Sequence, residues 1–277
     1  MCLIAFAWRA HSPSRLIVAA NRDEYFGRPA ASAGFWDDHP NVLAGRDLEA
    51  GGTWLGVTLD GRFAALTNYR NPADKKTGAP SRGTLVADFL TGRTAPQDYA
   101  RQLEKRAMDY NGFSLLVADA QSMFFFSNRG GPARRVAPGV HGLSNHLLDT
   151  PWPKVETAKT KLAALLERPF DSEAAFRLLD DAERAPGGEL PSTGVSLELE
   201  EKLSAIRILA VGGYGTRCST VLNLGEGGRI EFHERSYRED GGESGKVGYR
   251  LTVQAGKARA SSRRAESPPP KTPLPAR

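Results

Sequence analysis

The sequence pairs short apolar runs across tight turns, and this pairing constrains the fold more than any other feature. The clearest pair is TWLGVTL (53–59) and RFAALTN (62–68), which flank Asp60-Gly61, a dipeptide typical of a two-residue β-hairpin turn. Runs joined by such short turns pair antiparallel. The other predicted strands are 2–8 and 15–20 around HSPS, 113–118 and 122–127 around DAQ, and 219–224, 229–234 and 248–253.

Helical periodicity occurs in pairs of segments that separate these hairpins. The segments are 83–91, 96–108, 153–167 and 172–181. A parallel sheet would instead alternate single strands with single helices. No internal repeat with a period of about 20 to 50 residues is visible. The sequence therefore predicts an α+β fold in which helices cover antiparallel sheets.

The excess positive charge lies at the C-terminal end of the chain. The formal net charge is +5, and residues 255–277 contain six basic side chains against one acidic side chain. This segment includes ESPPPKTPLPAR and lacks aromatic residues, so it cannot bury enough apolar surface to offset its ordering entropy. We expect one domain over 1–254 and a disordered, basic, proline-rich tail over 255–277. Because residues 1–254 are neutral, we expect no specific binding to nucleic acid by the folded part.

Cysteine usage and the N-terminal run indicate a reducing compartment. Cys2 and Cys218 are too few for a disulfide framework and lack the paired spacing of a zinc site. The first apolar run ends at Arg9, without a preceding basic segment or a following cleavage site. We therefore expect neither a signal peptide nor a membrane span, and a cytoplasmic location. The sequence leaves the oligomeric state open.

Local motifs for cofactors and metals fail on their spacing. GGYGTRC places Cys218 where a dinucleotide-binding fingerprint needs its third glycine, and GKS, GKT and CxxCH are absent. The run Asp37-Asp38-His39 has metal-ligand chemistry, but it precedes Pro40 in a polar loop. Metal sites need three or more converging ligands, so we expect a solvated turn there, and no resident cofactor or metal.

Cys2 follows the initiator Met1, and this position gives it a particular chemistry. Methionine aminopeptidase removes Met ahead of a residue as small as Cys, which would leave a free α-amine on Cys2. The ordinary pKa is about 7.7 to 8.0 for the amine and about 8.5 for the thiol, so near neutral pH the amine can take the thiol proton. Such a nucleophile needs an acid to orient the amine and donors for an oxyanion. The other interpretation is a small buried hydrophobe in the first strand.

Six motifs follow one another between residue 1 and about residue 240. They are MCLI at the start, AANRDEYFGRP (19–29), AGRDLEAGGTWLGV (44–57), ALTNYRNP (65–72), GLSNHLLDTPWPKV (142–155) and YGTRCSTVL (214–222). Together they resemble the NRDE family, also called the transport and Golgi organisation protein 2 family. That family is similar in turn to the amino-terminal-nucleophile (Ntn) hydrolases of the bile-salt hydrolase and penicillin acylase type. The resemblance implies a four-layer αββα sandwich of two antiparallel sheets between helices.

The resemblance also implies catalytic roles for five residues. Cys2 would attack the carbonyl of a small linear amide or thioester, and Asp23 would hold the amine of the nucleophile. Asn68 and Asn145 would support the oxyanion and the substrate, and Arg217 would match a late active-site arginine. Before the resemblance is counted, a turn or capping role at strand ends is the other interpretation of the two asparagines.

Five further residues of these motifs are candidates for substrate binding: Asn21, Arg22, Glu24, Arg46 and Trp54. The first three either build the pocket or form a charged turn that braces it. Arg46 alternatively forms a surface ion pair with the aspartate that follows it. Trp54 fits either the core or a pocket wall.

One position departs from the hydrolases and keeps an alternative open. They carry an arginine three residues before the orienting aspartate, where this chain has Ala20. Adjacent side chains of a strand point to opposite faces, so Arg22 does not simply replace that arginine. The alternative is a non-catalytic carrier with the same pocket, since the family has been linked to haem trafficking and to acyl-CoA or lipid handling. In the haem version Cys2 or a histidine would ligate the iron. A scaffold role has no support beyond the basic tail.

Overall fold

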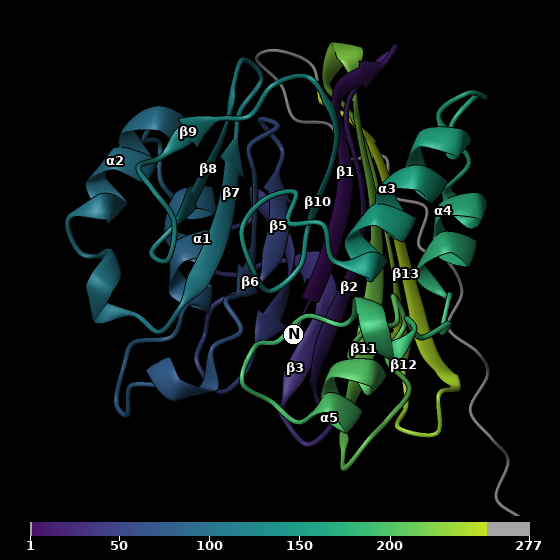
Figure 1. Cartoon of the computed structure of the whole chain (residues 1–277). Coiled ribbons are helices and arrows are strands. Elements are labelled where there is room, and N and C mark those ends of the chain that lie inside the picture. Colours follow the sequence, from purple (N-terminus) through teal and green to yellow (C-terminus); the bar gives the residue numbers. More distant parts are fainter. Residues whose placement is uncertain (1, 254–277) are drawn as a thin grey trace, which may run out of the picture.

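The computed structural model describes residues 2–253, and the tail expected at 255–277 lies outside this range. Within the described residues the strands form two antiparallel sheets, which lie face to face with helices on both outer faces (Figure 1). This arrangement confirms the predicted α+β class and its αββα layering. Within the same residues, no helix combines the length and apolar composition needed to cross a membrane.

The first sheet has the strand order β10-β1-β2-β11-β12-β13 and contains the hairpin predicted at the N-terminus. Cys2 lies opposite Arg22 on β2, and β11 returns on the other side of β2 to place Cys218 opposite the same Arg22. These strands are β1 (Cys2–His11), β2 (Ser14–Tyr25), β10 (Gly139–Leu143), β11 (Tyr214–Gly225), β12 (Arg229–Tyr237) and β13 (Glu243–Thr252).

The second sheet follows the chain in simple succession from β3 to β9. The turn at Asp60-Gly61 joins β5 to β6 as predicted, and Gly61 has a φ of 79°, which glycine adopts without strain. The strands are β3 (Ala30–Phe35), β4 (Val42–Asp47), β5 (Leu55–Thr58), β6 (Phe63–Asn68), β7 (Phe113–Ala118), β8 (Met123–Ser127) and β9 (Arg134–Arg135).

The helices begin at recognisable start signals in the sequence. Pro96 and Pro153 stand in the first turns of α2 and α3, where a missing N–H costs nothing. Asp171 and Ser196 cap α4 and α5 through their side-chain oxygens. The helices are α1 (Gly83–Thr91), α2 (Pro96–Glu104), α3 (Pro153–Leu165), α4 (Ser172–Leu179) and α5 (Leu197–Lys202), with 3₁₀ turns at Pro72–Asp74, Ala107–Asp109, Gly187–Glu189 and Glu226–Gly228.

The strand β1 is buried on both of its faces, which explains its unbroken apolar sequence. Ile4, Phe6 and Trp8 point into the core between the two sheets. Leu3 and Ala5 point the other way, into the core beneath α3 and α4. In β2 the same alternation continues, so even-numbered side chains face the second sheet and odd-numbered ones face the helices. This rule sets the direction of every functional side chain at the ends of β1 and β2.

Candidate active site

A cavity of about 540 Å³ opens between the sheets where β1 begins. We call it the Cys2 cavity. Its walls come from both sheets and from the segment that leads into α1, and it has the size of a small-molecule site. Its charged wall residues are Arg22, Asp23, Glu24, Arg28, Arg46, Asp47, Glu49, Arg82, Arg217 and Glu234.

Cys2 lies at the edge of this cavity with its side chain on the face toward the second sheet. It is 8% exposed, and its backbone carbonyl accepts a hydrogen bond from Ser144 Oγ at 3.1 Å. Burial raises the pKa of the Cys2 thiol, the charge of Asp23 raises it further, and Arg22 opposes both. Near neutral pH the thiol therefore carries its proton.

Asp23 approaches the start of β1 from the helix side of the sheet. It lies one residue beyond the Cys2–Arg22 pair on β2 and is 2% exposed. Its Oδ1 accepts a hydrogen bond from Thr216 Oγ1 at 2.7 Å. Burial raises the pKa of Asp23, while Lys154 and the Thr216 hydrogen bond lower it. The structure thus brings Cys2 and Asp23 together around the first residue of β1.

Arg22 shares the face of Cys2 and lies directly opposite it. It points away from Asp23, as expected, but two-residue periodicity puts it on the same face as Ala20. A guanidinium therefore stands beside the thiol although position 20 carries none. Arg22 lies 3.9 Å from Glu24, a long ion pair, and both side chains line the Cys2 cavity.

The two predicted asparagines adopt different positions. Asn68 ends β6 and lines the Cys2 cavity from the facing sheet. Asn145 follows β10, is fully buried, and donates its Nδ2 to the backbone carbonyl of Asn68 at 2.9 Å. Its φ of 53° is left-handed, a conformation that asparagine tolerates better than most residues. Asn68 is thus the residue that faces the cavity, and Asn145 supports it.

Arg217 and Trp54 also line the Cys2 cavity. Arg217 lies inside β11, longer than the predicted 219–224, where the register shifts between Thr216 and Cys218. Its guanidinium donates to the backbone carbonyls of Tyr25 and Arg28. Trp54 packs at the same time against the core between the sheets.

The ion pair considered between Arg46 and its neighbour was wrong. Arg46 instead forms two hydrogen bonds to Asp38, and Asp47 pairs with Arg28 at 2.8 Å. The polar loop predicted as a solvated turn thus supplies the partner of Arg46. Both arginines still line the Cys2 cavity.

Asn21 does not line the Cys2 cavity. Its side chain faces the helices, where Nδ2 donates to the carbonyls of Leu179 and Ile206, both at 2.9 Å. Its Oδ1 accepts from Ser219 Oγ at 2.6 Å. Of the two interpretations of Asn21, these contacts favour bracing, because they tie β2 to the end of α4, to the segment before β11 and to β11 itself.

Sequence reasoning missed a group of buried charges beside Asp23. Arg70 pairs with Glu200 at 2.5 Å, and Lys154 is only 3% exposed. Burial lowers the pKa of Lys154 to about 8, against the opposing influence of Asp23. Lys154 belongs to the TPWPKV run, whose proline predicts a helix start, but nothing in that run signals a buried lysine.

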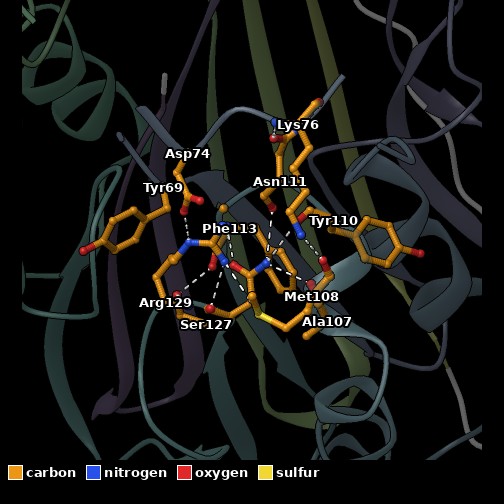
Figure 2. Close-up of polar contacts among 12 residues, drawn as sticks. Tyr69, Asp74, Lys76, Ala107, Met108, Tyr110, Asn111, Phe113, Ser127 and Arg129 are labelled. Carbon is orange, nitrogen blue, oxygen red and sulfur yellow. Dashed lines mark hydrogen bonds and ion pairs between the residues drawn. The ribbon is translucent and has the colours of Figure 1, made fainter. Parts of the chain in front are cut away.

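Side-chain contacts hold the loop that follows Asn68 in place (Figure 2). Asn111 accepts from the backbone of Lys76 at 2.7 Å and donates to its carbonyl at 3.1 Å. Arg129 pairs with Asp74, which ties the same loop to the end of β8. Arg82 donates to the carbonyl of Gly112 at 3.0 Å. These contacts fix the cavity wall next to Asn68.

Within residues 2–253, no group of three or more His, Cys, Asp or Glu side chains is arranged to hold a metal ion. The cavity offers the thiols of Cys2 and Cys218, and no histidine or methionine of the described residues lines it. Burial raises the pKa of both thiols. Of the residue types that ligate haem iron in proteins, the wall of the cavity holds these two cysteines and Tyr237.

Comparison with known proteins gives matches over most of the chain. Residues 1–239 match the family model described as Transport and Golgi organisation 2. The Transport and Golgi organization protein 2 homolog of Bos taurus is 38% identical over 258 residues, covering 85% of this chain and 93% of that protein. The Homo sapiens homolog is 35% identical with the same coverage, and the Drosophila melanogaster protein is 27% identical over 269 residues.

Two solved structures are similar at low sequence identity. A Caenorhabditis elegans orthologue of N-acylethanolamine-hydrolyzing acid amidase has a TM-score of 0.47 and 13% identity, over 80% of this chain and 92% of that one. A mutant conjugated bile acid hydrolase from Clostridium perfringens has a TM-score of 0.47 and 9% identity, over 94% of this chain and 99% of that one.

Proposed function

The chain belongs to the Transport and Golgi organisation 2 family, and from that premise we propose that it is a cysteine hydrolase of small linear amides or thioesters. Removal of Met1 would leave the α-amine on Cys2. One observation carries the proposal: Cys2, Asp23 and Asn68, which come from three different strands, all line one cavity at the start of β1.

The proposed reaction proceeds through a thioester between substrate and enzyme. The α-amine of Cys2 takes the thiol proton, and Sγ forms a bond to the carbonyl carbon of the substrate. The Asn68 side-chain amide donates to the resulting oxyanion, which is where preorganised donors contribute most. Collapse breaks the bond to the leaving nitrogen or sulfur, which receives the proton from the amine. Water then attacks the thioester, with the amine again as base, and releases the acid and free Cys2.

Asp23 would hold the amine in this sequence. It follows the residue that pairs with Cys2, and its side chain lies on the opposite face of the sheet from the thiol. The amine can therefore bridge the two groups at the strand end. Burial raises the pKa of the Cys2 thiol, so in this scheme the thiol keeps its proton until the α-amine accepts it.

The walls of the cavity favour a polar substrate that carries an anionic group. Arg82 and Arg217 donate to backbone carbonyls, and neither forms an ion pair with a carboxylate of the described residues. A carboxylate or phosphate on the substrate would complete their hydrogen bonding, since guanidinium groups bind both in two-point fashion. We place this thiol chemistry in the cytoplasm, because a reducing compartment keeps Cys2 free.

The decisive test is acylation of Cys2 by an activated ester. Full-length protein whose mass shows Met1 removal is mixed with p-nitrophenyl acetate, quenched in acid and mapped by peptide mass. We expect a burst of p-nitrophenolate and an acetyl group on the Cys2 peptide. The Cys2→Ala variant should lose both, whereas Cys218→Ser, which removes the other thiol of the cavity, should keep both. Processed protein that forms no adduct at Cys2 contradicts the proposal.

A non-catalytic carrier is the second candidate, and the buried, protonated thiol of Cys2 is the observation that favours it. A carrier would bind an anionic acyl compound in the Cys2 cavity without turnover. Equilibrium dialysis with an acyl thioester separates the two: a carrier binds ligand equally as wild type and Cys2→Ala and releases no product. Hydrolysis by wild type alone supports the enzyme.

A further inference from the structure

A second cavity, of about 830 Å³, lies between the two sheets at the end of β1 that is far from the N-terminus (Figure 1). We call it the hairpin cavity, because its wall includes the turns that join β1 to β2, β5 to β6 and β11 to β12. Arg9 stands at this end of β1, roughly 23 Å from Cys2 along the strand. The hairpin cavity and the Cys2 cavity have no wall residue in common among the described residues, so they are separate sites.

The floor of the hairpin cavity is the end of the core between the sheets. Leu224 and Ile230 belong to that core, and Leu59 and Val253 pack against it while partly buried. All four side chains line the cavity. A cavity of this volume with apolar walls and a few polar groups is typical of a small-molecule site. The apolar part of a ligand would therefore lie against these four side chains.

Three arginines surround this apolar floor: Arg9, Arg15 and Arg229. None of them forms an ion pair with a carboxylate of residues 2–253. Arg15 donates Nη2 to the carbonyl of Gly61 at 2.9 Å, which connects the first sheet to the second. The side chain of Arg229 folds back over Gly225, where an added Cβ would lie 3.5 Å from the Arg229 Nε. The cavity thus combines an apolar floor with guanidinium groups that lack a counter-ion.

Arg9 adopts an uncommon backbone conformation at the edge of this cavity. Its φ of 49° lies in the left-handed region, which few residues other than glycine adopt. Its Nη2 donates to the carbonyls of Ala120 and Gln121, both at 2.9 Å, so the turn between β7 and β8 fixes the guanidinium. Strained conformations of this kind persist where surrounding contacts hold them, and they are concentrated at ligand sites.

The charges of the wall favour an anion as the occupant. The wall carries two acids, Asp60 and Glu226, and Asp60 already accepts a hydrogen bond from Asn41 at 3.2 Å. Three arginines against two acids leave an excess of positive charge. The chain's own continuation beyond Val253 does not complement this charge, because residues 255–277 contain six basic side chains against one acidic side chain.

We propose that the hairpin cavity binds an amphipathic oxyanion from outside the chain. A carboxylate or phosphate headgroup contacts Arg9, Arg15 and Arg229, and an apolar body covers the floor. Guanidinium groups bind both headgroups in two-point fashion. This site goes beyond the proposed hydrolase, and neither site needs the other.

The test is isothermal titration calorimetry of the full-length protein with octanoate and octyl phosphate, which present the two headgroups on the same apolar body. We expect at least one of them to bind, and the tighter one identifies the headgroup. Octanol lacks the charge and inorganic phosphate lacks the apolar body, so each should bind at least about tenfold more weakly. Binding of octanol or inorganic phosphate as tight as that of the anions would overturn the inference.

The variants Arg15→Met and Arg229→Met should each weaken binding of the anion about tenfold, because each removes a charge-assisted hydrogen bond. Arg15→Lys keeps the charge and should weaken binding less. Arg101→Met, which removes an exposed charge from α2, is the matched control and should bind as wild type. A thermal melt shows which variants fold, and the exposed position of Arg229 keeps the test open where Arg15→Met does not. Wild-type affinity in a folded Met variant of either arginine overturns the inference.

Two further variants separate this site from the Cys2 cavity. Cys2→Ala should bind the anion as tightly as wild type, and Arg15→Met should keep the wild-type rate of acetylation at Cys2. An affinity that depends on Arg217 and not on Arg15 would place the anion in the Cys2 cavity and overturn the inference. Failure of both anions to bind, as when the C-terminal segment or a second copy fills the cavity, would overturn it too. Failure of p-nitrophenyl acetate to acylate Cys2 would instead refute the hydrolase and leave this site intact.

Discussion

Asn145 donates its side-chain amide to the backbone carbonyl of Asn68, at 2.9 Å. The resemblance to hydrolases implied that both asparagines act directly on the oxyanion and the substrate. The structure instead gives them a serial arrangement, in which one lies behind the other. Asn68 faces the cavity, while Asn145 is fully buried behind it. The backbone N–H of Arg70 donates in turn to the backbone carbonyl of Asn145, at 2.7 Å. The segments that follow β6 and β10 therefore hold each other in place.

The first prediction concerns the oxyanion. Asn68→Ala should lower the rate of acetylation at Cys2 by about 100- to 1000-fold, the usual cost of one oxyanion donor, with little loss of stability. Asn145→Ala should lower the rate less and destabilise the fold by about 1 to 3 kcal/mol, because it leaves a buried carbonyl unpaired. The p-nitrophenolate burst and urea unfolding measure the two effects.

The control for Asn145 is glycine, which accepts the left-handed backbone at this position, where φ is 53°. Asn145→Gly should recover the strain part of the loss and not the hydrogen-bond part. Wild-type burst rates in Asn68→Ala, or a larger loss of rate in Asn145→Ala, would contradict the serial arrangement.

The second prediction separates bracing from ligand binding at Asn21. Asn21→Ala removes three buried hydrogen bonds and should destabilise the protein by about 3 kcal/mol. Asn21→Asp should cost more, because a carboxylate cannot donate to the two carbonyls. Both variants should keep the wild-type rate of Cys2 alkylation while folded. Asn223→Ala is the matched control on β11, since Asn223 Oδ1 has no partner among the described residues. A change in the rate of Cys2 alkylation without a change in the free energy of unfolding would contradict bracing and support a role of Asn21 in ligand binding.

Most of the fold followed from local patterns because several signals agreed. The β5–β6 hairpin combined apolar strands with an Asp-Gly turn, and α1 was predicted with its observed bounds of 83–91. The helix predicted over 96–108 ends at Glu104, and a 3₁₀ turn covers 107–109. These elements could be predicted from the sequence because periodicity and turn chemistry agreed.

The strands β3, β4 and β10 escaped notice because their sequences are poor in large apolar residues. AASAGF (30–35) and GVHGL (139–143) consist largely of small residues, which carry little periodic signal. Such strands form because neighbours and register impose pairing. Gly45 on β4, for example, would place a Cβ 3.1 Å from the carbonyl of Ala31. Small side chains therefore permit this close approach of strands, but they leave no hydrophobic pattern from which a strand can be predicted.

The candidate site was readable only where a family motif marked it. The resemblance supplied Cys2, Asp23 and Asn68, which the structure gathers at one cavity. The partners of buried charges, such as Glu200 for Arg70, come from segments more than a hundred residues apart. No local pattern encodes such a pairing, because it depends on where α5 lies relative to the segment after β6.

The third prediction concerns that buried pair. Arg70→Met strands the Glu200 carboxylate, which also accepts two hydrogen bonds from Thr193, and should cost about 3 to 5 kcal/mol. The double variant Arg70→Met/Glu200→Leu should regain most of this loss, because no uncompensated charge remains. Urea unfolding of the two single variants and the double variant gives the coupling energy. Additive losses would mean that the two side chains stabilise the fold independently.

The fourth prediction concerns the loop that carries Asn145, which the His141–Asp149 pair closes at 2.7 Å. The hydrogen bond to Asp149 raises the pKa of His141, so its stabilising effect is complete below the ordinary value of about 6.5 and is lost as pH rises through the raised pKa. Burial alone would raise the pKa of Asp149, but hydrogen bonds from His141 and Gly142 lower it. The stability that ionised Asp149 contributes is therefore lost only as pH falls through that lowered pKa.

His141→Gln should thus cost about 1 kcal/mol near pH 6, and the difference from wild type should shrink in alkaline solution. Urea unfolding at intervals between about pH 4 and 9 measures this difference. His11→Gln is the control, because His11 lies at a hairpin end and forms no ion pair among the described residues. In the wild type, the loss of the His141–Asp149 pair with rising pH should change the rate of Cys2 acetylation only weakly. The pair holds the loop of Asn145 and does not contact Asn68. A stability difference that grows with rising pH would show that His141 is held neutral in the folded protein.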